Sequence, residues 1–383
     1  GVALTQARAH IARDQMKQAL ALLVPAADEA AKIRGADTRE HALGGIHEDV
    51  AAQARASLDA LYRLMEKGIR PRDIMTERAF ENAIVTVYAM GGSTNMYLHL
   101  LAIAREAQVP IGIERIQAVG EKVPLLANLQ PHGPYAMTSL HAIGGVPIVM
   151  KELLAAGFLH GDVMTVTGKT LAENLAEVPT LDRLGTQDIV RPVKDPIAPP
   201  NNHISVLKGN LAPESCLLKL SGKTLEKGVF RGTARVFESE ADAMTAIRAG
   251  EIVAGNVVVV RNVGPVGGPG MPEMVMLTIQ LQGRGLGEDV ALITDGRFSG
   301  VSHGILIGHI SPEAAKGGPI AAVHDGDTIV IDPTMRTLDL DLPAAEIASR
   351  VANCKPVESP VRRGSVHHKY VRLVSSAHYG CVV

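Results

Sequence analysis

The first part of the chain shows the spacing of apolar side chains that is typical of amphipathic helices. Residues 1 to about 80 carry Ala, Leu, Met and Ile at helical spacing with charges between them, and 56–65 is a clear example. Pro25 and the Gly44-Gly45 pair are predicted to interrupt this run. The pattern therefore predicts several helices before residue 80.

The helical pattern continues into the middle of the chain. A stretch that starts at Ala79 leads through a Gly-Gly-Ser-Thr turn into the largely apolar segment 96–104. Residues 145–154 are predicted to form another helix, and 162–167 a strand, because its valines and threonines are typical of strands. A further helix is predicted to start within 167–170 and to extend through Asn174.

The pattern changes after a Pro-rich, polar segment, 189–203, which we interpret as a linker. Helices are predicted over 240–249 and 344–352. Short β-branched runs separated by Gly, Pro and Asp predict strands at 257–260, 275–278, 290–294 and 328–332. This indicates an α/β fold with two domains. A mainly helical domain over 1–195 precedes a β-rich α/β domain over 205–383, for which a small barrel is one possible form.

Composition and charge exclude several classes of protein. The chain has 383 residues, a length that favours two domains, and its 3% aromatic content predicts an aliphatic core. A net charge of −2 gives no basic surface for nucleic acid or an anionic membrane. No window carries the 18 apolar residues of a membrane span. The first residues do not resemble a signal peptide, and the absence of a starting Met indicates a trimmed chain or a fragment.

The cysteines indicate a reducing compartment. Cys216, Cys354 and Cys381 are odd in number and far apart, and they form no Cys-x-x-Cys pair. A disulfide framework is therefore not expected, and we predict a cytoplasmic protein.

Two glycine-containing loops carry the candidate chemistry, and each follows a predicted strand. The first, 261–274, contains four glycines and three prolines within 264–272, so its backbone is bent and stiff. Its carboxylate, Glu273, is a hard oxygen donor of the kind that Mg²⁺ prefers. A structural turn in which Glu273 caps a helix is an equally good interpretation of the residues alone.

The second loop, 294–304, concentrates polar side chains at a strand end, where α/β proteins often bind ligands. Arg297 could bind a carboxylate through two hydrogen bonds. Ser299 could act as a nucleophile or base if a neighbouring base, cation or metal activated it, and the sequence does not identify such a neighbour. On the residues alone a structural role for Ser299 remains the more common case.

Three weaker patterns are interpreted as structural. The Gly91-Gly-Ser-Thr-Asn95 turn could bind an anion, but an ordinary helix N-cap is favoured. The Thr167-Gly-Lys-Thr170 segment is not a phosphate loop, because position 163 is Val and not the required glycine. His132 and His141 could carry protons, but packing roles are favoured.

The segment Thr294–Ser302 resembles the second signature of the dihydroxy-acid/6-phosphogluconate dehydratase family. The resemblance runs from about residue 62 to the end of the chain. Further blocks resemble the family in the same order, at 67–75, 91–95, 127–137, 159–162, 167–174, 209–213, 267–273 and 308–314.

The resemblance implies a hydro-lyase that dehydrates 2,3-dihydroxy acids to the 2-keto-acid precursors of valine and isoleucine. It implies an iron–sulfur cluster together with Mg²⁺, with Glu273 as a Mg²⁺ ligand and Ser299 as the base that takes the C2 proton. Arg297 and Ser302 are assigned to substrate binding, although Arg297 and Asp295 also suit a role in building the loop. A swivelling β-barrel, an active site between the two domains and a homodimer are expected.

The chain also departs from the family pattern. The family places its cluster cysteines in N-terminal blocks that include Cys-Asp-Lys, and this chain contains no such tripeptide. We therefore predict that Cys216, Cys354 and Cys381 are not cluster ligands. Two alternatives stay open: a sugar-acid (aldonate or 6-phosphogluconate) dehydratase, favoured by 261–265, and a catalytically incomplete fragment.

Overall fold

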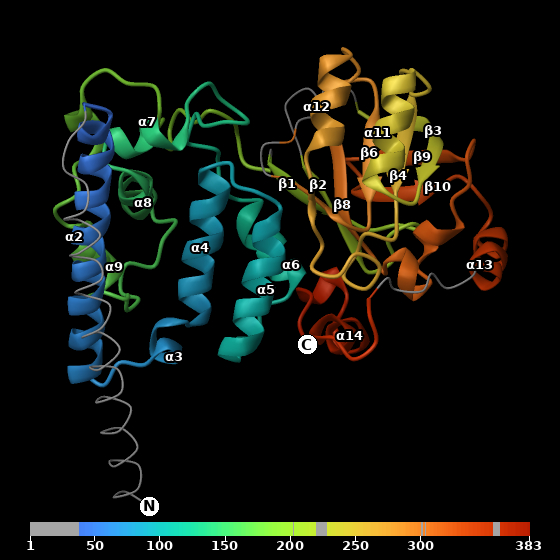
Figure 1. Ribbon diagram of the computed structural model, residues 1–383. Helices are drawn as coiled ribbons and strands as arrows, with labels where there is room; N and C mark the ends of the chain where they lie inside the picture. Colours follow the sequence, from blue (N-terminus) through green and yellow to red (C-terminus); the bar gives the residue numbers. More distant parts are fainter. Residues whose placement is uncertain (1–37, 202, 220–227, 300–301, 303, 355–360) are drawn as a thin grey trace, which may run out of the picture. The chain divides into compact units, whose positions relative to one another are not determined.

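The computed structural model describes residues 38–383 except 202, 220–227, 300–301, 303 and 355–360, and for 38–50 it describes only the backbone (Figure 1). The predicted break at Pro25 therefore lies outside the described residues. The chain divides into two compact units, residues 1–70 with 165–169 and residues 71–164 with 170–383.

In the first unit the principal element is one long helix, α2 (Thr38–Glu66). It runs without interruption through Gly44 and Gly45, so the predicted break at this pair is wrong. A glycine costs a helix only about 1 kcal/mol relative to alanine, and good helix formers on both sides outweigh that cost. After α2, the Lys67 ammonium donates a hydrogen bond of 2.8 Å to the carbonyl of Gly168 within the same unit.

The predicted strand at 162–167 is also wrong, because these residues form turns. The only pairing here is an isolated bridge between Met164 and Thr170. Thr170 is the N-cap of α9 (Leu171–Leu175), and it forms a reciprocal capping box with Glu173. The helix predicted to follow 167–170 is thereby confirmed. The threonine side chains that suggested a strand lie in a turn and at the N-cap of α9 instead.

The helices predicted around the 90–95 turn and over 145–154 are confirmed. Thr76 caps α4 through its side chain, and Phe80, Ile84 and Tyr88, one turn apart, face a buried aliphatic core. In the second unit the helical segments before the sheet are α3 (Pro71–Ile74), α4 (Glu77–Ala89), α5 (Asn95–Ala107), α6 (Ile113–Gly120), α7 (Met137–Ala142), α8 (Val146–Ala155), α9 and η1 (Leu181–Leu184).

An eight-stranded sheet organises the rest of this unit, with the strand order β1-β2-β8-β6-β4-β3-β9-β10. The strands β3, β4, β6 and β8 are parallel, and the outer strands on each side are antiparallel. Their bounds are β1 (Ile204–Leu207), β2 (Ser215–Lys219), β3 (Phe230–Phe237), β4 (Asn256–Val260), β6 (Ala291–Thr294), β8 (Ile305–Ser311), β9 (Thr328–Asp332) and β10 (Thr337–Leu340).

The two ends of this sheet approach each other. Lys208, directly after β1, forms a parallel bridge with Thr337 at the start of β10. The sheet is therefore nearly closed, which confirms the prediction of a mixed α/β fold with a barrel-like sheet.

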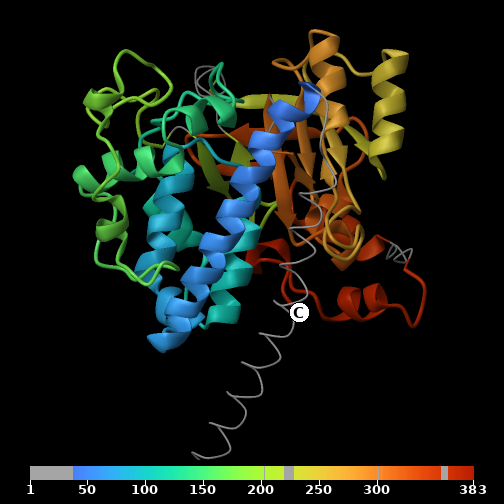
Figure 2. The same cartoon turned by 60° about the vertical axis from the view of Figure 1, so that its left-hand side comes forward.

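Side chains alternate between the two faces of the sheet, as strand geometry requires. In β4, Val257 and Val259 lie in one core, whereas Val258 and Val260 lie in another, which also contains residues of α11 (Glu240–Ala249) and α12 (Met276–Gly283). In Figures 1 and 2, α11 and α12 lie beside one another over these strands.

The strand predicted at 275–278 is wrong, because Val275 is the N-cap of α12 and the next three residues are helical. Leu277 and Leu281 are buried one helical turn apart against the strands. The prediction judged only four residues, and the helical spacing becomes visible only when the segment is followed to Gly283.

The remaining elements complete the second unit. A separate two-stranded sheet pairs β5 (Glu273–Met274) with β7 (Arg297–Phe298) in parallel. The other helices are η2 (Ala314–Lys316), η3 (Pro319–Ala322), α13 (Ala344–Asn353), α14 (Val366–Leu373) and η4 (Ala377–Tyr379). Across the described residues, no helix has the length and apolar character needed to cross a membrane.

Candidate active site

The structure brings the two glycine-containing loops together. Glu273 in β5 and Arg297 in β7 are paired in register, and the N–H of Ser299 donates to the carbonyl of Met274 at 3.2 Å. Ser299 thus follows the strand that pairs with the one containing Glu273. The residues that the resemblance assigned to base and metal ligand are neighbours in the fold.

The carboxylate of Glu273 is exposed, and it accepts a hydrogen bond from the side-chain amide of Asn95. Asn95 is the first residue of α5 and belongs to the 91–95 turn. The α5 N-cap, Thr94, forms no side-chain capping bond, and Ser93 accepts the N–H of Asn95 instead, at 3.2 Å. The turn predicted to be an ordinary N-cap therefore also contributes a contact to Glu273.

Asp295 anchors one side of the 261–274 loop, called the Gly/Pro loop below. Its fully buried carboxylate accepts backbone N–H bonds from Asn262, Val263 and Ala314 at 3.1, 3.1 and 2.9 Å. Burial raises the pKa of Asp295 to about 6, although the three bonds oppose that rise. Asp295 therefore builds the loop, in agreement with the structural role considered from the sequence.

Glu313 holds the centre of the same loop. Its carboxylate accepts the N–H groups of Val266 and Gly267, both at 2.9 Å. A side chain on Gly267 would meet the Asn262 backbone at 2.6 Å, which explains a glycine at this position. Burial and the neighbouring Asp295 together raise the pKa of Glu313 to about 7, although the two backbone hydrogen bonds oppose that rise. Glu313 lies 40 residues after Glu273, so no local pattern connects it with this loop.

The two predicted substrate-binding residues have partners within the protein. Arg297 donates from Nε to the carbonyl of the buried Met271, which joins the two loops. Ser302 is 2% exposed, and its hydroxyl accepts a hydrogen bond of 3.3 Å from Thr278 in α12.

Lys219 is a residue that sequence reasoning missed. It ends the buried strand β2, and its Nζ donates to the carbonyl of Ser302 at 3.1 Å. Lys219 and Ser299 line the same cavity, whose volume is about 10 Å³, together with Thr94, Leu217, Phe298, Leu306 and Gly308. Burial lowers the pKa of Lys219 to about 8. Its one signal in the sequence is a lysine in an otherwise apolar strand.

A histidine pair lies beside the 91–95 turn. The buried ring of His203 contacts the carbonyl of Gly92 through Nε2 at 2.6 Å and stands edge-on to His132 at a centroid distance of 4.8 Å. The pKa of His203 is lowered to about 3 by burial, and then by repulsion from His132 and Lys219. The packing role predicted for His132 is confirmed, but the one predicted for His141 is wrong, because His141 is exposed on α7.

The described residues do not fit an iron–sulfur cluster. Cys216 lies inside the barrel-like sheet, Cys354 bonds the carbonyl of Ala321, and Cys381 contacts Met271. Among the residues that the structure describes, no group of three or more His, Cys, Asp or Glu side chains could hold a metal ion. Glu273 alone also falls short of a complete Mg²⁺ site.

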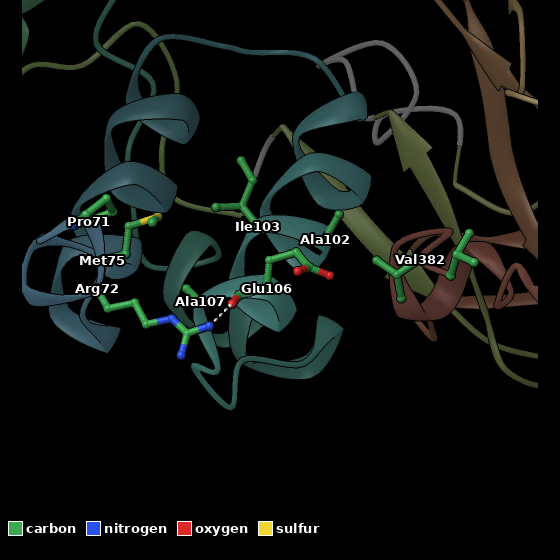
Figure 3. Close-up of a pocket in the computed structure, with 9 residues that line it drawn as sticks. Pro71, Arg72, Met75, Ala102, Ile103, Glu106, Ala107 and Val382 are labelled. Carbon is green, nitrogen blue, oxygen red and sulfur yellow. Dashed lines mark hydrogen bonds between the residues drawn. The ribbon is translucent and has the colours of Figure 1, made fainter. Parts of the chain in front are cut away.

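A larger cavity lies elsewhere in the second unit. It has a volume of about 470 Å³ and is lined mainly by apolar side chains of residues 71–75, α5 and the chain end, including Met75, Ile103 and Val382 (Figure 3). Arg72 on its wall donates to the carbonyl of Glu106 at 3.3 Å. None of its lining residues belongs to the two loops, so the chemistry concentrates at the smaller cavity.

Comparison with known proteins identifies the family. Residues 42–174 match the sequence profile of the dihydroxy-acid/6-phosphogluconate dehydratase N-terminal domain, and residues 188–381 match the C-terminal one. The chain belongs to the dihydroxy-acid/6-phosphogluconate dehydratase family, so the resemblance found in the sequence is confirmed.

Similar curated proteins are named dihydroxy-acid dehydratase. The protein of Methylococcus capsulatus is 50% identical over 346 residues, which cover 89% of this chain and 60% of that protein. The protein of Francisella tularensis subsp. tularensis is 49% identical over 324 residues, which cover 85% of this chain and 57% of that protein. The chain thus spans somewhat more than half the length of the curated relatives that it matches.

Proposed function

We propose that this chain serves a hydro-lyase that dehydrates 2,3-dihydroxy-carboxylic acids to 2-keto acids in valine and isoleucine biosynthesis. The observation that carries the proposal is the side-by-side placement of the Glu273 and Ser299 loops through β5 and β7. The similarity to proteins named dihydroxy-acid dehydratase supports this substrate class over the sugar acids.

In this reaction Ser299, as an alkoxide, removes the C2 proton. The electrons of the C2–H bond form a C2–C3 double bond while the C3–O bond breaks. The departing hydroxide takes up a proton and leaves as water, and the resulting enol becomes the 2-keto acid. An alkoxide needs nearby positive charge, because a serine hydroxyl is otherwise neutral at pH 7.

The other assignments are part of the same proposal. Glu273 supplies one carboxylate ligand to Mg²⁺, held in place by Asn95. Arg297 and Ser302 shape the substrate pocket from the Ser299 loop. The family's iron–sulfur cluster has no ligands among the three cysteines of this chain.

We further propose a domain boundary between residues 195 and 205. The barrel-like sheet is a swivelling domain, the working protein is a homodimer, and it acts in the cytoplasm. The absence of a membrane-spanning helix among the described residues is consistent with the last assignment.

A second candidate is a catalytically incomplete member of the family. It is favoured by the positions of Cys216, Cys354 and Cys381, which lie in separate environments within the described residues. Glu273 and Ser299 would then form only part of a site.

The test combines activity with metal analysis. The purified chain is assayed for 2-keto-acid formation from a branched 2,3-dihydroxy acid and from an aldonate, and iron and acid-labile sulfide are measured per chain. The first proposal would be supported if the chain turns over the branched acid, if Ser299→Ala abolishes this turnover, and if Ser349→Ala, at an exposed position of α13, preserves it. No turnover and no bound iron would reject it in favour of the incomplete member.

A further inference from the structure

The end of β2 places a buried lysine in the cavity that the candidate base also lines. Lys219 is 9% exposed, and its neighbours Cys216, Leu217 and Leu218 are also buried. Removing an ammonium group from water is costly, so such a lysine is rarely retained only for packing. Its position therefore calls for a specific role.

Hydrogen bonds connect Lys219 to Ser302 and Ser302 to Ser299. Its ammonium donates to the carbonyl of Ser302, and the N–H of Ser302 donates to the carbonyl of Ser299, both at 3.1 Å. The strand pairing Lys219↔Leu306 anchors the lysine backbone in the main sheet. Lys219 and Ser299 also line the same small enclosure.

The enclosure strengthens electrostatic interactions. Its volume of about 10 Å³ is close to the space that a single water molecule requires. With so little solvent, a charge interacts more strongly than it would in bulk water. Among the described residues, other titratable groups in this region include His203, whose pKa is lowered by burial, His132 and Lys219, and Glu273 and Arg297 on β5 and β7.

We propose that Lys219 is a positioning residue that stabilises the anionic form of the Ser299 hydroxyl and thereby makes Ser299 competent as a base. This inference rests on the proposed role of Ser299 and adds the source of positive charge that this role requires. The lysine itself does not transfer the proton of the substrate.

Burial of Lys219 lowers its pKa and so limits the pH range in which its charge can stabilise the Ser299 anion. Because the pKa of Lys219 is lowered to about 8, its ammonium form is present below that pH and is lost above it. The reactivity of Ser299 should therefore rise with pH and then level off near pH 8. An arginine at position 219 would keep its charge, so the rise should continue.

The experiment measures the reactivity of Ser299 without requiring dehydratase activity. The chain is treated with phenylmethanesulfonyl fluoride between pH 6 and 10, and peptide mass spectrometry quantifies the modified Ser299. The Ser299 oxygen forms a bond to sulfur while the S–F bond breaks, fluoride leaves and the hydroxyl proton passes to solvent. Ser299→Ala identifies the site of labelling.

The decisive comparison is between Lys219→Met, Lys219→Arg and the control Lys208→Met, whose lysine is exposed and paired with Glu114. We expect Lys219→Met to slow labelling about tenfold or more, because an adjacent opposite charge favours the ionised form by at least that factor. Lys208→Met should label as the unchanged chain does. In Lys219→Arg, Ser299 should be labelled below pH 8 at a rate comparable to that in the unchanged chain. Above pH 8 its labelling rate should continue to rise and not level off.

Equal labelling of Lys219→Met and the unchanged chain would overturn the proposal, as would an unchanged chain in which Ser299 is never labelled. If Lys219→Met does not fold, the pH profile of Lys219→Arg decides: levelling near pH 8 in both proteins contradicts a role for the lysine. If Ser299 is labelled as expected but the chain forms no 2-keto acid, the proposed function is rejected and the proposal on Lys219 stands.

Discussion

The side-chain amide of Asn95 donates a hydrogen bond to the carboxylate of Glu273, although 178 positions separate the two residues in the chain. This bond connects the start of α5 to the loop that carries the proposed metal ligand. A helix terminus and a Gly/Pro loop that the sequence presents as unrelated segments thus form one surface.

Replacing Asn95 by Asp should create a site that responds to divalent cations. The substitution places two carboxylates side by side, and their repulsion should lower the free energy of unfolding by about 0.5–1 kcal/mol without added metal. Millimolar Mg²⁺ should restore this loss, because bound cation stabilises the folded state. Thermal melts with and without Mg²⁺ measure both effects.

The matched control for that substitution is Asn353→Asp. Asn353 is exposed on α13, and its amide donates only to a backbone carbonyl. Its melting temperature should not depend on Mg²⁺. A Mg²⁺ response of equal size in both variants would contradict the proximity of Asn95 and Glu273.

Asp295→Ala should be strongly destabilising. It leaves the N–H groups of Asn262, Val263 and Ala314 without the carboxylate that accepts them. Each unsatisfied buried N–H costs about 1–3 kcal/mol, so a loss of about 3 kcal/mol or more is expected in urea unfolding. Asp341→Ala removes an exposed partner of Arg231 and should cost less than about 1 kcal/mol. Similar losses in both variants would reject the role of Asp295.

Glu313 should make stability depend on pH. Its pKa is raised from 4.5 to about 7 in the folded protein, so between these values the folded state holds a proton that the unfolded state has released. The stability contribution is complete below pH 4.5 and is lost as the pH rises to about 7.

Relative to Glu313→Gln, the unchanged chain should therefore lose on the order of 1–3 kcal/mol between pH 4.5 and 7. Urea unfolding at several pH values measures the difference between the two proteins. A difference that stays constant, or that increases in favour of the unchanged chain as the pH rises, would contradict a raised pKa for Glu313.

The three thiols should react with a disulfide reagent at different rates. Cys216 is fully buried, and burial raises its pKa well above the usual range for a thiol. The pKa of Cys381 is raised to about 12, again mainly by burial. Since the thiolate is the reactive form, Cys354 should react first at pH 8 in the folded chain.

All three cysteines should react rapidly in denaturant. Identification of the modified peptides by mass spectrometry gives the order in the folded chain. Fast modification of Cys216 without unfolding would show that β2 is not buried as the structure describes it.

Local elements whose patterns are complete within a short window could be predicted from the amino-acid sequence alone. The helices around the 91–95 turn, α11 and α13 follow from apolar spacing and local capping, and β4, β6 and β9 follow from short β-branched runs between turns. The ordered motif blocks also identified the family. Where a window was too short or a single residue was given too much weight, as at 275–278 and Gly44-Gly45, the prediction was wrong.

Contacts between residues that are distant in the sequence became known only from the fold. The pairing of Glu273 with Arg297, the contact of Asn95 with Glu273, and the enclosure shared by Lys219 and Ser299 depend on strand order and on the packing of α5 near the sheet. Periodicity in a sequence reports which face of an element is buried, but it does not report the neighbour against which that face packs. The loops with candidate chemistry were visible in the sequence. The Lys219 cation in the cavity that Ser299 also lines was not, because the fold of the sheet brings the end of β2 to Ser302.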